Sequence, residues 1–294
     1  MLKKASFIII VFFSFAFAQA PADFQEKENG FIAPRLKEER RKAAETEKNF
    51  VRRRHNGRAL PGREKLIFNV MWKFVAVGEA SLQLRGFADI GGRKAHHIYS
   101  YAKTKPFFDS VFKVRDINQS WLDEESKVSL KYASNISEGG WNKNETLYFD
   151  QIHHTYLLND NGKMKKGPAS ENVQDVLSAL YFIRTLDIKA GKSYVLDAHS
   201  GDMSWPLTVK VLKKEKIKVP AGEFKCLALE PVIRKDSGIV NAQGKMLVWV
   251  TDDEIKMPVY LKVKIPILGF VEAKLISVKN ADMESVMTEN VNGK

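Results

Sequence analysis

Apolar and polar residues alternate in short runs from residue 65 to residue 279, and turn-forming residues separate the runs. A period of two places every second side chain on one face of a strand, so these runs predict strands with one buried face. One clear run places three apolar residues on the same face: Ala80, Leu82 and Leu84. The next run places three ring-bearing residues on one face: His97, Tyr99 and Tyr101. The pattern predicts a mainly β, antiparallel domain.

Two pairs of runs have the form of hairpins. Residues 217–219 and 224–229 flank Pro220-Ala221-Gly222-Glu223, and residues 245–250 and 259–265 flank an acidic segment that includes Asp252 and Asp253. Proline, glycine and aspartate between two strand-like runs are typical turn residues. These segments therefore predict neighbouring antiparallel strands.

One segment departs from the alternation. Residues 172–186 carry apolar side chains at helical spacing: Val173, Val176, Leu177, Leu180 and Tyr181. Asn172 is the predicted N-cap, with Asp175 as a capping-box-like partner. A second flank adds Phe182, Ile183 and Leu186, and a helix apolar over so much of its girth needs cover on several sides. We therefore predict a large curved antiparallel sheet, or half-open barrel, wrapped around one central α-helix.

The first 18 residues predict a secretion signal. Lys3 and Lys4 precede an apolar run at residues 7–13, and small residues at Ala16 and Ala18 suit cleavage after Ala18, with Ala20 as the alternative. No cysteine stands at either cut for lipid attachment. The expectation is an exported, periplasmic protein. An uncleaved inner-membrane anchor is the alternative, although the apolar stretch is shorter than the ~20 residues of a spanning helix.

Residues 19–63 form a charged basic linker or exposed helix, because their few apolar residues make no sustained stripe. Arg52-Arg53-Arg54 resembles a patch that binds anionic surfaces, and a solvated linker is the alternative. Pro61-Gly62 precedes a β domain predicted at residues 64–280, followed by a tail at 281–294.

The formal net charge is +12 and is spread along the chain. A basic surface attracts anionic partners such as lipid headgroups and acidic glycans, or reflects no specific partner at all. Nucleic-acid binding requires a clustered stripe or a recognisable fold, and the sequence offers neither, so we predict no nucleic-acid partner.

Catalytic and metal motifs are missing from the sequence. It has no G-x-S-x-G, no H-E-x-x-H and no phosphate-binding glycine loop. Its one cysteine, Cys226, lies in an apolar run and is expected to be a buried small hydrophobe. His96-His97 and His153-His154 are expected on strands, where adjacent side chains point to opposite faces. Asp197, His199 and Asp202 suit a charged turn. We therefore predict no catalytic residue, no metal and no cofactor.

The aromatic residues suggest a binding role. Six of them are candidates for an apolar pocket: Trp72, Phe107, Phe108, Phe112, Trp121 and Trp141. Lys105 and Lys113 bracket the phenylalanines and are candidates for contact with an anionic headgroup. Apolar walls with basic residues at the mouth suit an acyl chain with an anionic head, and ordinary core packing is the alternative.

Several short motifs occur together in a fixed order. They are Val77-Gly78-Glu79-Ala80, Glu138-Gly139-Gly140-Trp141, residues 173–184, residues 219–224, and residues 248–253 with Pro258-Val259. In this order they resemble the DUF3108 family of exported bacterial proteins, over roughly residues 64–278. The resemblance implies an envelope protein with a curved antiparallel sheet, and it supplies no catalytic residues and no established activity.

These observations favour a non-enzymatic periplasmic envelope protein that binds or carries an amphipathic lipid or lipid-linked glycan. Two alternatives remain. One is a structural or scaffolding protein that docks on an envelope protein through residues 19–63. The other is a hydrolase acting on envelope polymers, since catalytic groups distant in sequence can assemble in space.

Overall fold

The computed structural model describes residues 57–233, 246–265 and 269–279. The predicted signal peptide, most of the charged segment at 19–63 and the C-terminal tail lie outside these ranges. Neither helix in the described part of the chain has the length and hydropathy of a membrane-spanning segment.

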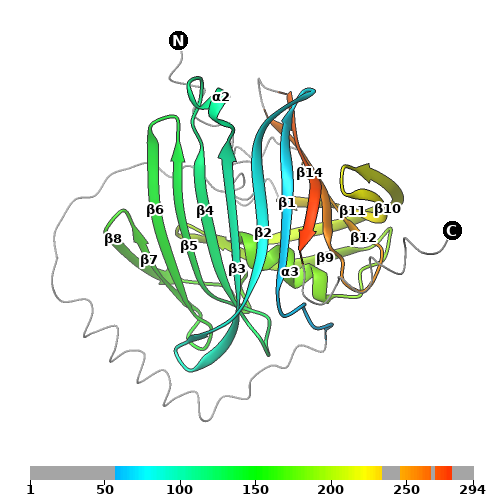
Figure 1. Cartoon of the computed structure of the whole chain (residues 1–294). Helices are drawn as coiled ribbons and strands as arrows, with labels where there is room; N and C mark the ends of the chain where they lie inside the picture. The colour runs from blue at the N-terminus through cyan, green and yellow to red at the C-terminus, as the bar shows by residue number, and fades with distance from the viewer. Residues whose placement is uncertain (1–56, 234–245, 266–268, 280–294) are drawn as a thin grey trace.

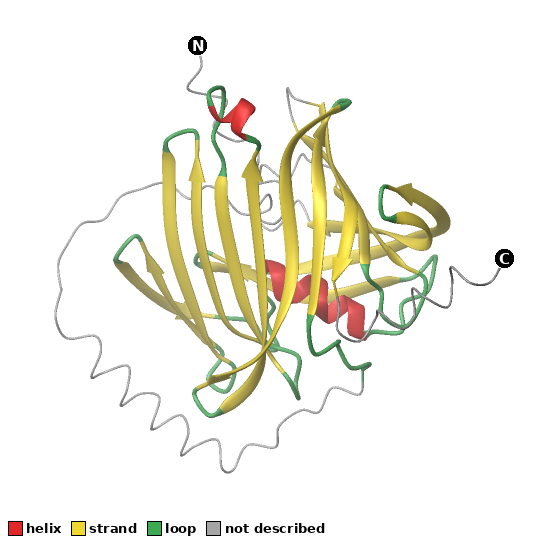
Figure 2. Ribbon diagram, viewed as in Figure 1, coloured by secondary structure: helices red, strands yellow, loops and turns green. Residues whose placement is uncertain are grey.

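Strands dominate the structure (Figures 1 and 2). The first eight are β1 (Glu64–Trp72), β2 (Val75–Ile90), β3 (Arg93–Thr104), β4 (Arg115–Asp123), β5 (Ser129–Glu138), β6 (Trp141–Asp150), β7 (Thr155–Asp160) and β8 (Lys163–Pro168). The other six are β9 (Ser193–Ser200), β10 (Met203–Val219), β11 (Gly222–Ile233), β12 (Met246–Thr251), β13 (Pro258–Ile265) and β14 (Gly269–Lys279). In the described ranges two helices accompany them, α2 (Pro106–Asp109) and α3 (Val176–Thr185). The sequence pattern did not predict the short α2.

All fourteen strands belong to one antiparallel sheet, in the order β8-β7-β6-β5-β4-β3-β2-β1-β14-β13-β12-β11-β10-β9. Strands that follow one another along the chain are paired, except β8 and β9, and β1 also pairs with β14. The two edge strands, β8 and β9, are the ones that flank α3 in sequence. The prediction of a curved, incompletely closed antiparallel sheet around a helix is confirmed, as are both predicted hairpins.

Helix α3 lies on the concave side of the sheet (Figure 2). Its N-cap is Asp175, so the prediction of Asn172 is wrong. Asn172 has a left-handed φ of 53°, and Gln174 forms an extended bridge with Ala198. The chain therefore cannot become helical before Asp175, whose carboxylate accepts hydrogen bonds from the amides of Leu177 and Ser178.

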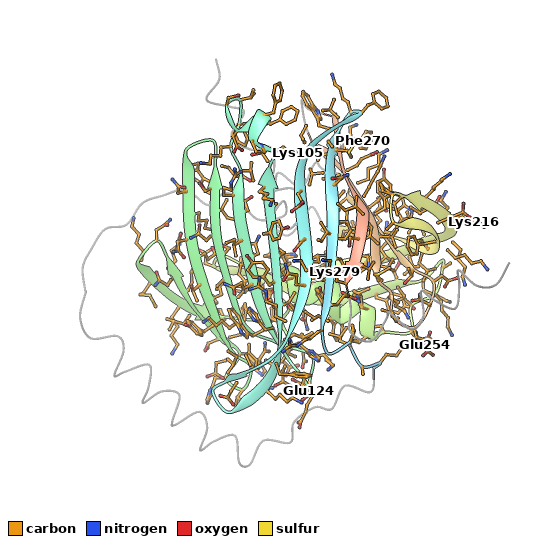
Figure 3. All side chains as sticks on the ribbon, viewed as in Figure 1. Lys105, Glu124, Lys216, Glu254, Phe270 and Lys279 are labelled. Atoms are coloured by element: carbon orange, nitrogen blue, oxygen red, sulfur yellow. The ribbon has the colours of Figure 1, made fainter. Side chains whose placement is uncertain are left out.

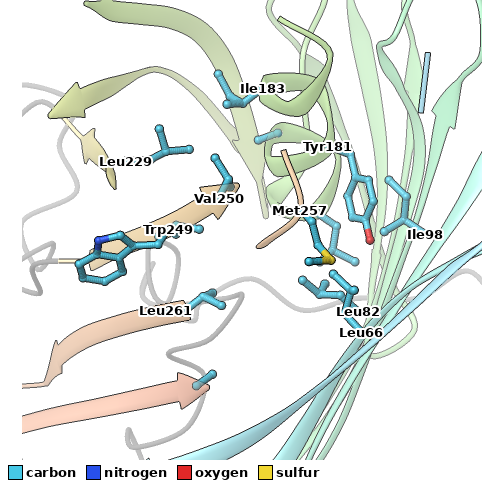
Figure 4. Close-up of a cluster of buried hydrophobic side chains, with 14 of the residues drawn as sticks. Leu66, Leu82, Ile98, Tyr181, Ile183, Leu229, Trp249, Val250, Met257 and Leu261 are labelled. Atoms are coloured by element: carbon cyan, nitrogen blue, oxygen red, sulfur yellow. The ribbon is translucent and has the colours of Figure 1, made fainter. Parts of the chain in front are cut away.

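The larger of two buried apolar clusters in the described residues includes both walls of the sheet and the helix. Tyr181 and Leu177 of α3 are fully buried, as are Ile98 of β3 and Val250 of β12. Figure 4 shows Tyr181 projecting from the helix toward Ile98. The predicted inward face of β2, including Leu82, belongs to this cluster. The broad apolar surface of the helix is thus covered on several sides.

The segment before α3 joins the two edge regions of the sheet. The Gln174 amide donates to the Asp197 carbonyl at 2.8 Å, and the His199 amide donates to the Gln174 carbonyl at 2.8 Å. Next to it, the Ser129 amide of β5 donates to the Val173 carbonyl at 3.1 Å. Residues 173–174 therefore connect β5 to β9 by backbone hydrogen bonds.

His199 fills the space between these regions. Its ring centroid lies 5.2 Å from that of Phe149 and 4.6 Å from that of Tyr156, on β6 and β7. The side chain is buried, and burial lowers the pKa of His199 to about 4. The imidazole is therefore neutral at pH 7.

We expect the protein to lose stability as the pH falls from 6.5 toward 4. The unfolded chain binds a proton at His199 below its ordinary pKa of 6.5, whereas the folded protein does so only below about 4. The pKa difference corresponds to about 3 kcal/mol of unfolding free energy. Urea denaturation at pH 7.5 and pH 4 measures this loss of unfolding free energy. In the His199→Gln variant, most of the pH-dependent loss assigned to His199 should be absent.

His96 provides the matched control, because burial also lowers its pKa to about 4. His96→Gln should abolish the part of the acid-induced loss of stability that His96 causes, and the part that His199 causes should remain. A His199→Gln variant as acid-sensitive as the wild type would contradict the assignment.

Candidate functional site

Exposed apolar side chains gather at one end of the sheet. They come from the β1–β2 turn, the α2 connection, the β5–β6 turn and the start of β14 (Figures 1 and 3). We call this set the aromatic rim: Trp72 (37% exposed), Phe74 (97%), Phe107 (80%), Val111 (79%), Trp141 (41%) and Phe270 (46%). Exposed apolar residues scattered singly are ordinary, whereas a gathering of this kind marks an interaction site.

The α2 connection projects because polar contacts hold its base. The Asp109 carboxylate accepts hydrogen bonds from the guanidinium of Arg115, at 3.1 Å from Nη1, and from the hydroxyl of Thr104. These two contacts hold the pKa of Asp109 below its usual range. The Thr104 hydroxyl in turn accepts from the Val114 amide at 3.1 Å. With its base held in this way, the connection leaves Phe107 exposed to solvent.

The neighbouring β5–β6 turn is attached to this connection. The Gly139 amide donates to the Lys113 carbonyl at 2.9 Å, and Gly139 has a left-handed φ of 54°. A Cβ at this position would overlap the Phe112 ring, so the close approach requires glycine. Trp141 follows two residues later. The two rim segments therefore form one unit.

Lysines accompany the rim. The ammonium of Lys73 lies 5.2 Å from the Trp72 ring centroid, and that of Lys262 lies 4.5 Å from the Phe270 ring centroid. Lys105 and Lys113 are exposed at the two ends of the α2 connection, and Figure 3 shows Lys105 at the same end of the molecule as Phe270. The rim thus combines apolar rings with positive charge.

The structure brings five of the six predicted aromatic residues to this end of the sheet. Trp72, Phe107 and Trp141 are exposed there, whereas Phe108 is half-buried against the core and Phe112 lies against Gly139. Trp121 lies elsewhere, on the outer face of the sheet, where it stacks on His97 with ring centroids 5.0 Å apart.

Phe74, Val111 and Phe270 were missed by sequence reasoning. Phe74 and Phe270 stand at or next to hairpin turns, where polar residues are usual, and that position is the signal that identifies them.

The polar groups proposed for chemistry do not assemble a catalytic centre. His199 Nδ1 lies 2.7 Å from the Ser204 hydroxyl, and Nε2 contacts the Gly201 carbonyl at 3.1 Å. In a catalytic triad the second ring nitrogen instead contacts a carboxylate. Asp202 of the predicted charged turn instead pairs with Lys165 at 3.0 Å. Burial raises the pKa of Cys226 to about 12, so its thiol is protonated at neutral pH.

The second histidine pair differs from the prediction. His153 and His154 lie in the β6–β7 turn instead of on a strand, since His154 has a left-handed φ of 52°. His153 Nδ1 pairs with Asp150 Oδ2 at 2.7 Å. Across residues 57–233, 246–265 and 269–279, no cluster of three or more His, Cys, Asp or Glu side chains has the arrangement of a metal site.

Two solved structures are among those that match the chain. The crystal structure of a β-barrel-like protein of the domain of unknown function DUF1849 from Brucella abortus matches with a TM-score of 0.51 and 7% identity, covering 76% of this chain and 100% of that one. A putative exported protein with a YmcC-like fold from Bacteroides fragilis matches with a TM-score of 0.31 and 10% identity, covering 78% and 100%. The Brucella likeness concerns the fold alone.

No curated protein matches the chain. The family model described as "Protein of unknown function (DUF3108)" matches residues 67–276, which include every strand from β2 to β13 and most of β1 and β14. Because this match covers well over half of the sequence, the protein belongs to the DUF3108 family.

Proposed function

We propose that this protein is a non-enzymatic, exported envelope protein that binds amphipathic lipids with anionic headgroups at its aromatic rim. The observation that carries the proposal is the gathering of exposed rings and lysines at one end of the sheet. A lipid or a lipid-linked glycan with a phosphate headgroup presents the same chemistry, namely acyl chains beside negative charge.

The rim suits lipid better than a rigid protein surface. Its apolar residues project from four separate connections, so they form spaced protrusions instead of one flat patch. Acyl chains can surround spaced protrusions, whereas a protein partner requires a matched pocket for each. Full burial of a phenylalanine side chain contributes about 2 kcal/mol. Phe74 and Phe107 are the strongest candidates because they are the most exposed rings of the rim.

Charge favours the same ligand. Lys73, Lys105 and Lys113 are exposed, and none of them forms an ion pair with a carboxylate of the described residues. A lysine near an anionic lipid surface contributes about 1 kcal/mol, and this contribution falls with added salt. Binding should therefore depend on both acyl chains and headgroup charge.

We expect the triple variant Phe74→Ser, Phe107→Ser and Val111→Ser to bind vesicles at least about ten-fold more weakly than the wild type, since its apolar protrusions are lost. The assay is flotation of the purified full chain with phosphatidylcholine vesicles that contain or lack phosphatidylglycerol. Residues 1–18 are retained or cleaved identically in all variants. The substituted side chains are 79–97% exposed, so the fold should be unaffected.

Val195→Ser with Leu212→Ser is the matched control, because these side chains are also exposed (69% and 42%) but lie on β9 and β10. This variant should bind like the wild type. Replacing the three lysines by glutamine should weaken binding only to vesicles with phosphatidylglycerol. Equal binding by the rim variant and the control variant would refute the proposal.

A further inference from the structure

Two carboxyl groups are buried side by side beneath the rim. Glu138, the last residue of β5, forms a β-bridge with Val114, and Asp116 stands two residues further along β4. Residues two apart on a strand share a face, so both side chains point to the same side of the sheet. Glu138 is 0% exposed and Asp116 is 4% exposed. We call these two residues the carboxyl pair.

The carboxyl pair shares a proton. Both oxygens of the fully buried Glu138 lack a hydrogen-bond donor in the described residues, and the Asp116 carboxyl lies on the same face of the neighbouring strand, so two ionised carboxylates here would be buried charges without compensation. Asp116 accepts a hydrogen bond from the Ser137 amide at 3.0 Å, whereas neither Glu138 oxygen receives one from an N–H or hydroxyl donor in the described residues. Glu138 is therefore the member that holds the proton.

Burial and the neighbouring Asp116 carboxyl raise the pKa of Glu138 to about 9, whereas burial raises the pKa of Asp116 to about 6 against the lowering effect of the hydrogen bond from the Ser137 amide. Burial and repulsion by a second negative charge both disfavour the ionised form of Glu138. Nearby charged groups are already paired. On β6, Lys143 lies 2.5 Å from Glu145, and at the base of α2, Arg115 is bound to Asp109. On β3, Ala102 lies opposite Asp116, and neither it nor the flanking Ser100 and Thr104 titrates.

The carboxyl pair lies where two rim segments are attached to the sheet. Glu138 immediately precedes Gly139, whose amide binds the Lys113 carbonyl, and Val114 ends the α2 connection. Asp116 binds the amide of Ser137 on the neighbouring strand. Any separation of the two carboxyls would therefore strain the contact that joins the α2 connection to the Trp141 turn.

We propose that the shared proton of Asp116 and Glu138 controls the attachment of the α2 connection to the β5–β6 turn, and thereby regulates lipid binding at the rim. With the proton bound, the two segments form one surface that presents Phe107, Val111 and Trp141 together. Loss of the proton at alkaline pH separates them. The regulatory part, namely control of lipid binding, rests on the proposed function. The structural part, namely control of the attachment between the two segments, does not.

The structural part is tested by amide hydrogen exchange of residues 112–116 and 137–141 in the full chain between pH 6 and pH 9. When the two segments separate, Glu138 becomes exposed and releases its proton in this pH range. The reason is that the pKa of an exposed glutamate lies near 4.5, whereas that of Glu138 in the folded protein lies near 9. Protection factors, which remove the intrinsic pH effect, should therefore fall about ten-fold for each pH unit in this window.

Glu138→Gln keeps the shape of a protonated acid and cannot ionise, so its protection in the same segments should be independent of pH. Glu145→Gln is the matched control: it makes the same chemical change at a buried carboxyl of β6 and should retain the wild-type pH dependence. Asp116→Asn, which also leaves at most one charge, is the second variant should Glu138→Gln fold poorly. Wild-type protection that does not change with pH would overturn the proposal.

Vesicle flotation then separates the two proposals. Wild-type binding should be at least about ten-fold weaker at pH 9 than at pH 6, in line with the exchange, and Glu138→Gln should bind equally at both. If exchange responds to pH but the protein binds no vesicles at any pH, the proposed function fails and the proton-controlled attachment stands. If vesicles bind equally at both pH values while exchange responds, the regulatory role is overturned.

Discussion

Replacing Arg184 by methionine is expected to lower the free energy of unfolding by about 4 kcal/mol, because it leaves the Glu64 carboxylate buried without its partner. The two side chains are 0% exposed and form a bidentate pair, with Nη1–Oε2 and Nη2–Oε1 distances of 2.8 and 2.7 Å. Arg184 Nε also donates to the Ile255 carbonyl at 3.3 Å. The pair therefore attaches α3 to β1 and to the β12–β13 connection.

Urea denaturation measures this loss, and the melting temperature should fall by about 10 °C for a domain of this size. Glu64→Gln should destabilise the protein for the complementary reason, since it leaves a buried guanidinium without a carboxylate. The double variant Arg184→Met with Glu64→Leu leaves no unpaired charge and should recover much of the stability. A double variant as unstable as the sum of the single variants would show that the pair acts only through packing.

Replacing Asp175 by alanine should lower the free energy of unfolding by about 3 kcal/mol or more, because four hydrogen-bond donors lose the carboxylate that accepts from all of them. The Asp175 carboxylate is fully buried and accepts from the amides of Leu177 and Ser178, each at 2.9 Å. It also accepts from the hydroxyls of Ser120 and Ser129 at 2.6 and 2.5 Å. Loss of an N-cap costs about 1 kcal/mol, and each buried donor left without a partner costs about 1–3 kcal/mol.

Asp175→Asn is the control for this prediction. Its amide oxygen can still cap the helix and its NH₂ group can donate to the two serine hydroxyls, so it should cost about 1 kcal/mol. Both variants are compared by urea denaturation, and amide exchange of Leu177 and Ser178 reports the cap directly. Equal destabilisation by alanine and asparagine would mean that the carboxylate is needed for its charge and not for its hydrogen bonds.

Local patterns sufficed for most of the fold. Alternation identified the inward face of β2, and turn residues located the β10–β11 and β12–β13 hairpins, because neighbouring antiparallel strands depend on short-range geometry. The helix was found for the same reason, but its start was placed three residues early. Val173 fits the helical spacing, yet it is buried in an extended segment, and pairing of Gln174 with β9 outweighs local propensity.

The candidate site was only partly predictable. The aromatic residues and lysines between β3 and β4 stood out in the sequence, because apolar side chains are unusual in a connection. Their meeting with Phe270 depends on the pairing of β1 with β14, which joins the two ends of the domain. Trp121 belongs to the same sequence cluster but points to the outer face of β4, a direction set by strand register.

By itself, the sequence determined the strands, the single amphipathic helix and the family, since these follow from periodicity and turn chemistry within a few residues. Only the tertiary structure decided which polar groups meet. Glu64 and Arg184 are 120 residues apart, and Asp116 and Glu138 occupy positions that look like ordinary polar sites in alternating strands. The energy of such groups depends on burial and on the partner across the fold, and neither is encoded in local spacing.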